Sequence, residues 1–371
     1  MFPGENCSYP KPLHGGNVWQ ACREFGGKPE EYLDFSSNIN PLGPSACALE
    51  AVKAALDRLW RYPDPDCRAL KGALADYLGA PAEWLLPGNG TAELINLLVA
   101  ALGIKRAVIP VPTFSEYAGS VTAWGGKVYT TPLLPGEDFR ISLPRLTAIL
   151  PGANALFLCH PNNPTGHVVP HEELAALVRE SARAGAFLVV DEAFLDFLPE
   201  REALTAIGFL HRYHHVMILY SLTKFFGLAG LRLGVLVAAP AVLAKIKAVV
   251  PPWNVNTLAQ VAGAAAVADG EYIDKSRRVV AAEREFLKKA LNDLPGVRVI
   301  PGTANFLLVD IHSTGLRTGA ITRRLAEKRI LVRDVSNFAG LEDWYIRIAV
   351  RLRAENRCLV EGLRAVLAQG Y

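Results

Sequence analysis

The sequence predicts an α/β protein, with a large domain built on a mostly parallel, doubly wound sheet and a smaller α+β domain after it. Between residues 85 and 224, short apolar runs alternate with helical patterns, as in parallel sheets with helical crossovers. The polar residues that could carry chemistry follow the ends of these runs, where open α/β sheets bind ligands. The 371 residues, 51% of them hydrophobic, suffice for both domains.

Three segments follow from changes in this pattern. Residues 1–40 are rich in proline and glycine and weakly periodic, and we interpret them as an arm that packs with the small domain. Residues 41–250 form the predicted large domain. After Pro251-Pro252-Trp253 the sequence becomes Ala-rich and helical, and strands and helices follow, so residues 251–371 form the predicted small domain.

The large domain begins with a predicted helix over 45–59, whose apolar residues recur every three or four positions. Asp66 is suited to cap a second helix, which ends at Gly79, and Thr91 to cap a third over 92–102. Strands are expected at 106–111, 155–159, 187–190 and 216–220, with a helix over 171–184. In the small domain we expect helices over 257–292, with a break near 270, over 316–328 and from 355, and strands at 297–300, 305–310, 330–333 and 345–351.

Composition excludes several function classes. The net charge of +3 gives no reason to expect nucleic acid or an anionic membrane as a partner. The six cysteines have no CxxC spacing, so we expect reduced thiols in a cytoplasmic protein and no metal site. The N-terminus is neither basic nor apolar, and no uncharged apolar run reaches the roughly 18 residues of a membrane span.

The stretch Ser221-Leu222-Thr223-Lys224 follows an apolar strand, and Arg232 comes eight residues later. A lysine buried between strands has a lowered pKa and becomes a nucleophile towards carbonyl groups. The hydroxyls of Ser221 and Thr223 and the guanidinium of Arg232 could hold a phosphate beside it. A reactive lysine next to a phosphate site suits pyridoxal 5′-phosphate. The alternative is a surface lysine in a loop.

Two further stretches could bind a flat, phosphorylated cofactor. Gly90, Thr91 and Ala92 lie at a glycine-rich turn that opens a helix, where free amides bind phosphate; an ordinary helix cap is the alternative. Glu93 stands where a dinucleotide fingerprint needs its third glycine, so this is not that motif. Phe114 follows a strand and could stack on a ring, although most such aromatics belong to the core.

Polar residues also follow the next two strands. Asn163 lies in a loop that prolines and a glycine make rigid, which would fix the orientation of its amide. Asp191 ends a buried strand, where a carboxylate needs a cationic partner. A protonated pyridine nitrogen would serve, as would a nearby arginine. Because the strands are parallel, these loops converge on one site.

Anion-binding side chains are candidates at both ends of the chain. In His14-Gly15-Gly16-Asn17, the glycines would let backbone amides approach a ligand, or they form a simple turn. Arg333, Arg347 and Arg351 lie on neighbouring predicted strands. Alternation places Arg347 on the face opposite Ile346 and Ile348, which is either solvent or an anion-binding cleft.

Together these residues resemble the aspartate aminotransferase superfamily of pyridoxal-phosphate-dependent enzymes, fold type I, over nearly the whole chain. The resemblance implies that Lys224 bonds the cofactor, Asp191 pairs with its ring nitrogen, Asn163 binds its ring oxygen and Phe114 stacks on the ring. The implied phosphate site consists of Gly90, Thr91, Ala92, Ser221, Thr223 and Arg232. Arg347 resembles the arginine that binds the substrate's α-carboxylate. Tyr62 resembles a tyrosine that reaches the cofactor phosphate across a dimer interface, which implies a homodimer.

Within this superfamily, the motifs are most similar to those of the threonine-phosphate decarboxylases of cobalamin biosynthesis. Shared motifs are His-Gly-Gly-Asn from His14, Asn-Ile-Asn-Pro-Leu-Gly from Asn38 and Tyr-Pro-Asp-Pro from Tyr62. The resemblance implies decarboxylation of L-threonine O-3-phosphate. Candidates for the substrate phosphate site are His14, Asn38, Arg333 and Arg351, with Asn163 and Arg347 also contacting the substrate.

Histidinol-phosphate aminotransferase of histidine biosynthesis is the alternative, because it shares the short length, the Asn-Pro-Thr-Gly and the Asp-Glu-Ala. Phe194 stands where aminotransferases usually have a tyrosine, which weakens that alternative. Two other classes stay open: a cofactor-binding regulator without turnover, and a nucleotide-dependent dehydrogenase. A yellow cofactor band that borohydride removes would separate a pyridoxal phosphate enzyme from a dehydrogenase.

Overall fold

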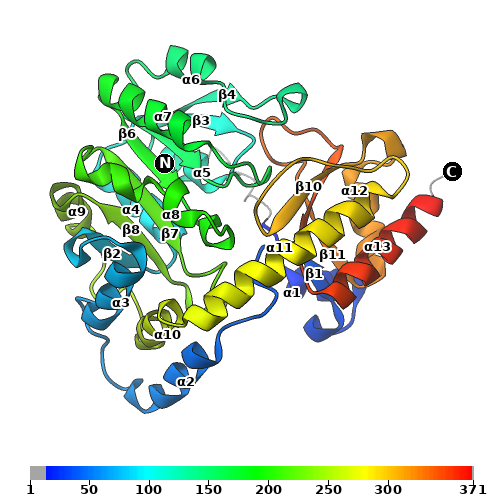
Figure 1. The fold of residues 1–371 in the computed structure, drawn as a ribbon, viewed down its shortest axis with the longest axis horizontal. Coiled ribbons are helices and arrows are strands. Elements are labelled where there is room, and N and C mark those ends of the chain that lie inside the picture. The colour runs from blue at the N-terminus through cyan, green and yellow to red at the C-terminus, as the bar shows by residue number, and fades with distance from the viewer. Residues whose placement is uncertain (1–13, 370–371) are drawn as a thin grey trace, which may run out of the picture.

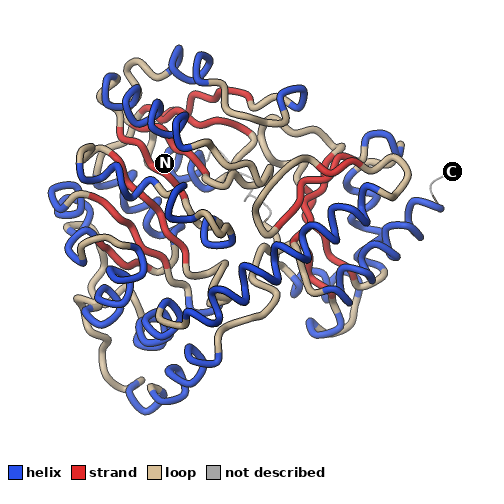
Figure 2. The backbone as a smooth tube through the Cα atoms, viewed as in Figure 1, coloured by secondary structure: helices blue, strands red, loops and turns tan. Residues whose placement is uncertain are grey.

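The computed structural model describes residues 14–369 and contains two sheets (Figures 1 and 2). The large sheet has the order β2 (Leu85–Gly88), β8 (Gly234–Ala238), β7 (Val216–Ser221), β6 (Phe187–Asp191), β5 (Ala155–Cys159), β3 (Arg106–Val111) and β4 (Lys127–Pro132). Neighbouring strands are parallel except at β8, which runs antiparallel to both β2 and β7. The predicted fold class, with its mostly parallel sheet, is confirmed.

Both faces of the large sheet are buried, because alternate residues of each central strand enter different cores. In β6, Leu188 and Val190 pack into the larger core, whereas Val189 packs into the second. Residues of α3 (Arg68–Leu78), α7 (His171–Arg183) and α10 (Thr257–Val267) complete the larger core. Residues of α4 (Thr91–Ala101), α5 (Glu116–Ala123) and α9 (Pro240–Lys247) complete the second. The remaining large-domain helices are α2 (Ala46–Ala54), α6 (Leu143–Ile149) and α8 (Arg201–Leu204).

The small sheet has the order β1 (Leu33–Phe35), β11 (Ile330–Asp334), β12 (Tyr345–Ala349), β10 (Phe306–Asp310) and β9 (Arg298–Val299). Strand β1, from the N-terminal arm, pairs in parallel with β11, so the arm completes one edge of this sheet. The sheet packs on the second half of α11 (Gly270–Asn292) and on α12 (Thr318–Glu327) and α13 (Arg353–Ala368). The arm also contains α1 (Val18–Phe25).

The predicted domain boundary at residue 251 is wrong. Ala259 and Ala262 of α10 are fully buried in the core of the large domain, where α10 packs on α2 and α3. Helix α11 then crosses between the domains (Figure 1): Val280 belongs to the large-domain core and Leu287 to the small-domain core. The apolar face of α10 packs into the large domain, and α11 contributes to both cores, so the boundary lies within α11.

Two predicted helix caps are also wrong. The carboxylate of Asp64, not that of Asp66, accepts the Arg68 N–H at 2.8 Å at the start of α3. Helix α4 begins at Thr91 itself, and Gly90 takes the cap position with a φ of 84°. Strand β4 was not predicted, because an edge strand with exposed residues lacks a continuous apolar run.

The described residues contain no helix long and apolar enough to cross a bilayer. Five cysteines fall within the described residues and are free thiols: Cys22, Cys47, Cys67, Cys159 and Cys358. The sixth, Cys7, lies outside the described residues.

Candidate active site

A cavity of about 350 Å³ opens at the carboxyl ends of β5, β6 and β7, between the two domains and the arm. Most of the predicted site residues line it: His14, Asn38, Thr91, Ala92, Phe114, Asn163, Asp191, Ser221, Thr223, Lys224, Arg232, Arg333 and Arg347. Residues from positions 14 to 347 therefore meet at the edge of the sheet where the sequence predicts a site.

Lys224 follows β7 and carries the amine of the cavity wall. Burial, with Arg347 and Arg232 close by, lowers the pKa of this amine to about 8, and the attraction of Asp191 opposes the shift. A substantial neutral fraction is therefore present near neutral pH, as a nucleophilic lysine requires.

Asp191 is 4% exposed at the end of β6. Its Oδ2 accepts the Tyr117 hydroxyl at 2.7 Å, and its Oδ1 accepts the Ala193 N–H at 3.0 Å. Burial raises the pKa of Asp191, while these two hydrogen bonds and the charge of Lys224 lower it. Within residues 14–369 no basic side chain pairs with this carboxylate, so it can accept a cationic group of a ligand.

The start of α4 and the residues around β8 form a tight cradle for an anion. Gly90 has a φ of 84°, and a Cβ there would lie 2.7 Å from Nη2 of Arg232. A Cβ at Gly234 would lie 2.7 Å from the Thr91 nitrogen. The first-turn amides of α4, the Arg232 guanidinium and the hydroxyls of Ser221 and Thr223 thus border one end of the cavity. This donor set fits the phosphate of pyridoxal phosphate.

Two buried arginines face the cavity from the small domain. Arg333 of β11 and Arg347 of β12 are register partners, so both side chains project from the same face of the sheet. Arg347 donates to Asn163 Oδ1 at 2.5 Å and to the Ser36 carbonyl at 2.8 Å. Burial and the charge of Arg333 lower the pKa of Arg347 to about 9. The face opposite the two isoleucines is therefore the cleft and not solvent.

The His14-Gly15-Gly16-Asn17 motif serves partly to attach the arm. A Cβ at Gly15 would lie 2.0 Å from the Ser36 carbonyl oxygen, and the Gly16 N–H donates to Ser36 Oγ at 2.7 Å. The glycines thus permit close approach to Ser36, and Gly15 also lines the cavity, where the sequence suggests approach to a ligand. Asn17 caps α1, while His14 lines the cavity and contacts Glu116 Oε1 at 3.1 Å.

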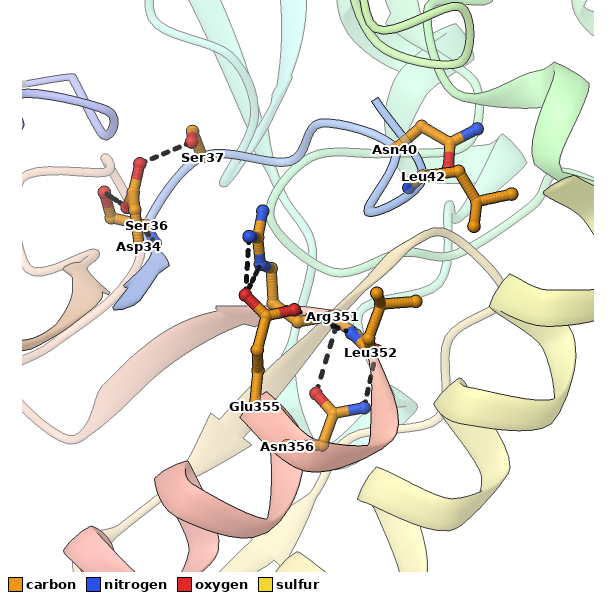
Figure 3. Close-up of polar contacts among 9 residues, drawn as sticks. All are labelled: Asp34, Ser36, Ser37, Asn40, Leu42, Arg351, Leu352, Glu355 and Asn356. Carbon is orange, nitrogen blue, oxygen red and sulfur yellow. Dashed lines mark hydrogen bonds and ion pairs between the residues drawn. The ribbon is translucent and has the colours of Figure 1, made fainter. Parts of the chain in front are cut away.

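Asp34 and Asn38 flank the same segment of the arm. Asp34 accepts the hydroxyls of Ser36 and Ser37, each at 2.6 Å (Figure 3). Asn38 is 2% exposed and lines the cavity, and its Oδ1 has no hydrogen-bond partner in the described part of the chain. A ligand donor would satisfy this oxygen.

Three predicted site residues do not line the cavity. Gly90 contacts the Arg232 side chain, which lines the cavity in its place. The Arg351 guanidinium pairs with Glu355 Oε1 at 2.7 Å at the start of α13 (Figure 3), because the strand ends at Ala349 and alternation no longer directs this side chain. Tyr62 is 77% exposed and stacks on Trp253 with ring centroids 4.3 Å apart.

Several residues of the site were not among the predicted ones. Tyr117 bonds Asp191, and Cys159, Glu116 and Phe338 line the cavity. Tyr117, in the first turn of α5 (Glu116–Ala123), comes three positions after Phe114, and the two rings meet edge-on with centroids 5.5 Å apart. The three-residue spacing of these two aromatics is the feature of the sequence that could have indicated Tyr117 as a site residue. Burial raises the pKa of the Cys159 thiol to about 12, so the thiol stays neutral.

The aminotransferase class I and II family matches residues 30–363. The chain belongs to this family. A threonine-phosphate decarboxylase from Salmonella typhimurium is 37% identical over 355 residues, which are 95% of this chain and 96% of that protein. A histidinol-phosphate aminotransferase from Moorella thermoacetica is 34% identical over 358 residues, which are 95% and 90% of the two chains.

The fold of this aminotransferase-family chain also matches a solved structure closely. A histidinol-phosphate aminotransferase from Sinorhizobium meliloti, determined in complex with pyridoxal-5′-phosphate, superposes with a TM-score of 0.87 at 26% identity, covering all of both chains. The predicted superfamily and its cofactor, pyridoxal phosphate, are confirmed. Relatives of both reaction types are similarly close, so the family membership leaves the reaction open.

Proposed function

We propose that the protein decarboxylates L-threonine O-3-phosphate, giving (R)-1-amino-2-propanol O-2-phosphate and CO₂ in cobalamin biosynthesis. The supporting observation is the pair of buried arginines, Arg333 and Arg347, on one wall of the cavity. Two neighbouring guanidinium groups disfavour each other's charge, so a substrate with two anionic groups would stabilise both. Threonine phosphate carries a carboxylate and a phosphate on a short carbon skeleton.

The charges around the cavity agree with such a substrate. Four lining residues are basic, namely Lys224, Arg232, Arg333 and Arg347, and two are acidic, namely Glu116 and Asp191. The surplus of positive charge favours anionic ligands, here the phosphate of the cofactor and the two anionic groups of the substrate. Arg232 lies at the cofactor end, which leaves the small-domain arginines for the substrate.

In this proposal Arg347 holds the substrate carboxylate, and Asn163 and the Ser36 carbonyl fix its guanidinium. Arg333 and His14 receive the phosphate, and Asn38 would donate to it through Nδ2, while its Oδ1 remains free to accept from another donor of the ligand. Pyridoxal phosphate, when bound, supplies an electron sink for the charge left on the α-carbon after a bond to it breaks. By holding the carboxylate, Arg347 would set the orientation of the bond between the α-carbon and the carboxylate, and this orientation would favour loss of CO₂ over loss of the α-hydrogen.

Lys224 would return a proton to the α-carbon. An amine with a pKa of about 8 can both hold and release a proton near neutral pH. Phe194 lies in the cavity wall and packs edge-to-face on Phe306, with centroids 5.0 Å apart. It offers no hydroxyl to the ring, which distinguishes this wall from the tyrosine that aminotransferases usually have.

The deciding experiment incubates the cofactor-loaded protein with L-threonine O-3-phosphate and no 2-oxo acid, and follows CO₂ and the amine product. We expect catalytic release of CO₂, none from unphosphorylated L-threonine, and none with Lys224→Ala. The alternative is a histidinol-phosphate aminotransferase, because a relative with that activity is almost as similar in sequence to this chain as the decarboxylase is. No CO₂, together with amino transfer from histidinol phosphate to 2-oxoglutarate, would establish that reaction instead.

We further propose a homodimer, because large apolar side chains gather on one exposed surface. Trp60 is 76% exposed and Tyr62 77%, and Leu56, Leu59 and Trp253 are also exposed. A second copy of the chain would cover this surface and bring Tyr62 to the partner's cofactor phosphate. Sedimentation should give twice the chain mass, and Trp60→Glu should shift it towards the monomer. A monomeric wild-type protein would contradict this.

A further inference from the structure

Tyr117 is the one side chain that hydrogen-bonds Asp191 within the described residues. Its ring is fully buried between Phe157, stacked at 5.4 Å between centroids, and Phe114, edge-on at 5.5 Å. The hydroxyl reaches Asp191 Oδ2 at 2.7 Å, while the Ala193 N–H holds Oδ1. Both oxygens of the carboxylate therefore have a fixed donor, and the plane of the carboxylate is fixed too.

The phenol is suited to act only as a donor. Burial and the charge of Asp191 hold the pKa of Tyr117 well above its ordinary value, so it stays protonated. The other titratable groups that face Asp191 are Cys159, which is a neutral thiol, and Lys224, which attracts the carboxylate more weakly than the hydrogen bonds do. Without the phenol, burial would favour the protonated carboxyl group.

We propose that Tyr117 is a positioning residue that keeps the Asp191 carboxylate ionised and aimed at the ring nitrogen of pyridoxal phosphate. A carboxylate fixed in this way attracts a protonated ring nitrogen, and that protonation makes the cofactor an effective electron sink. The proposal rests on the cofactor and on Asp191 facing its nitrogen. It holds for decarboxylation and for transamination alike, so its failure is distinguishable from that of the proposed reaction.

The test replaces Tyr117 with Phe and uses Tyr77→Phe as the matched control. The Tyr77 hydroxyl also donates to a buried carboxylate, Asp196 Oδ1 at 2.9 Å, but neither residue lines the cavity. The readouts are the dissociation constant of pyridoxal phosphate and the pH titration of the bound cofactor's absorbance. A lost hydrogen bond to a charged group should weaken cofactor binding about tenfold in Tyr117→Phe. Binding should be unchanged in Tyr77→Phe.

A double-mutant cycle shows whether Tyr117 acts through Asp191. In the Asp191→Asn background, Tyr117→Phe should have less than a twofold effect on cofactor binding and should no longer alter the absorbance titration. Tyr117→Phe should lower thermal stability, because the Asp191 carboxylate loses its donor. Adding Asp191→Asn should restore part of that stability, because the unpaired charge is removed. The double variant therefore keeps the test usable if Tyr117→Phe alone folds poorly. The proposal is overturned if Tyr117→Phe matches Tyr77→Phe, or if its effect is the same in both backgrounds.

Discussion

Replacing Lys224 with Met in the cofactor-free protein isolates the electrostatic cost of the active-site amine. Methionine has a similar length and no charge, so it fills the same space. Burial and the neighbouring Arg347 and Arg232 lower the pKa of Lys224 from an ordinary 10.5 to about 8. The unfolded chain carries no such penalty, and the folded state therefore loses stability by keeping a charged amine in the cavity.

The expected magnitude follows from the two pKa values. Their difference, 10.5 minus 8, or 2.5, corresponds to up to about 3 kcal/mol at about 1.36 kcal/mol per pKa unit. Because the folded pKa is the lower one, the unfolded state binds more protons between about pH 8 and 10.5, and wild-type stability rises with pH across that window. The gain in the free energy of unfolding from Lys224→Met should be greatest at pH 7 and should disappear near pH 10.5.

Urea unfolding at pH 7, 9 and 10, at one protein concentration, measures this difference. Lys247→Met on the exposed side of α9 is the control and should change stability by no more than about 0.5 kcal/mol at any pH. A gain of the same size at all three pH values would refute the electrostatic reasoning and assign the effect to packing. A loss of stability at pH 7 would refute it as well.

Two further predictions concern the substrate. Gly15→Ala places a Cβ 2.0 Å from the Ser36 carbonyl oxygen and should displace His14. The KM for threonine phosphate should then rise about tenfold, as expected for the loss of one charged hydrogen bond. Gly136→Ala, where a Cβ meets nothing within 4 Å, is the control, and equal KM values for the two variants would contradict the role of the arm. Arg333→Ala should raise KM for the phosphorylated substrate far more than it weakens cofactor binding, with the exposed Arg323→Ala as control; an unchanged KM would remove Arg333 from the phosphate site.

The sequence predicts the fold well where patterns are local. Parallel strands with two buried faces read as continuous apolar runs, so β3, β5, β6 and β7 were predicted close to their observed bounds. Position at a strand's carboxyl end then places Asn163, Asp191 and Lys224 in one cavity. Alternation correctly puts Arg347 opposite two isoleucines, although only tertiary packing decides that this face is a cleft.

The errors come from features that local patterns do not encode. An Ala-rich helix such as α10 can pack on either domain, so composition misplaced the boundary. The hydrogen bond from Tyr117 to Asp191 joins residues 74 positions apart, and its formation depends on how α5 packs on β3 and β4. Gly15 and Gly16 signal a close approach, but the sequence does not show whether a ligand or Ser36 makes it.

Helix α11 fixes the position of the small domain relative to the large domain, and thereby the shape of the cavity between them. Its 23 residues are anchored in the large-domain core at one end and in the small-domain core at the other. Inserting one residue would rotate one end against the other by about 100° and lengthen the helix by about 1.5 Å. The arginines of the small domain would then leave their positions opposite Lys224. The chain should therefore tolerate substitutions on the exposed face of this helix and reject changes in its length.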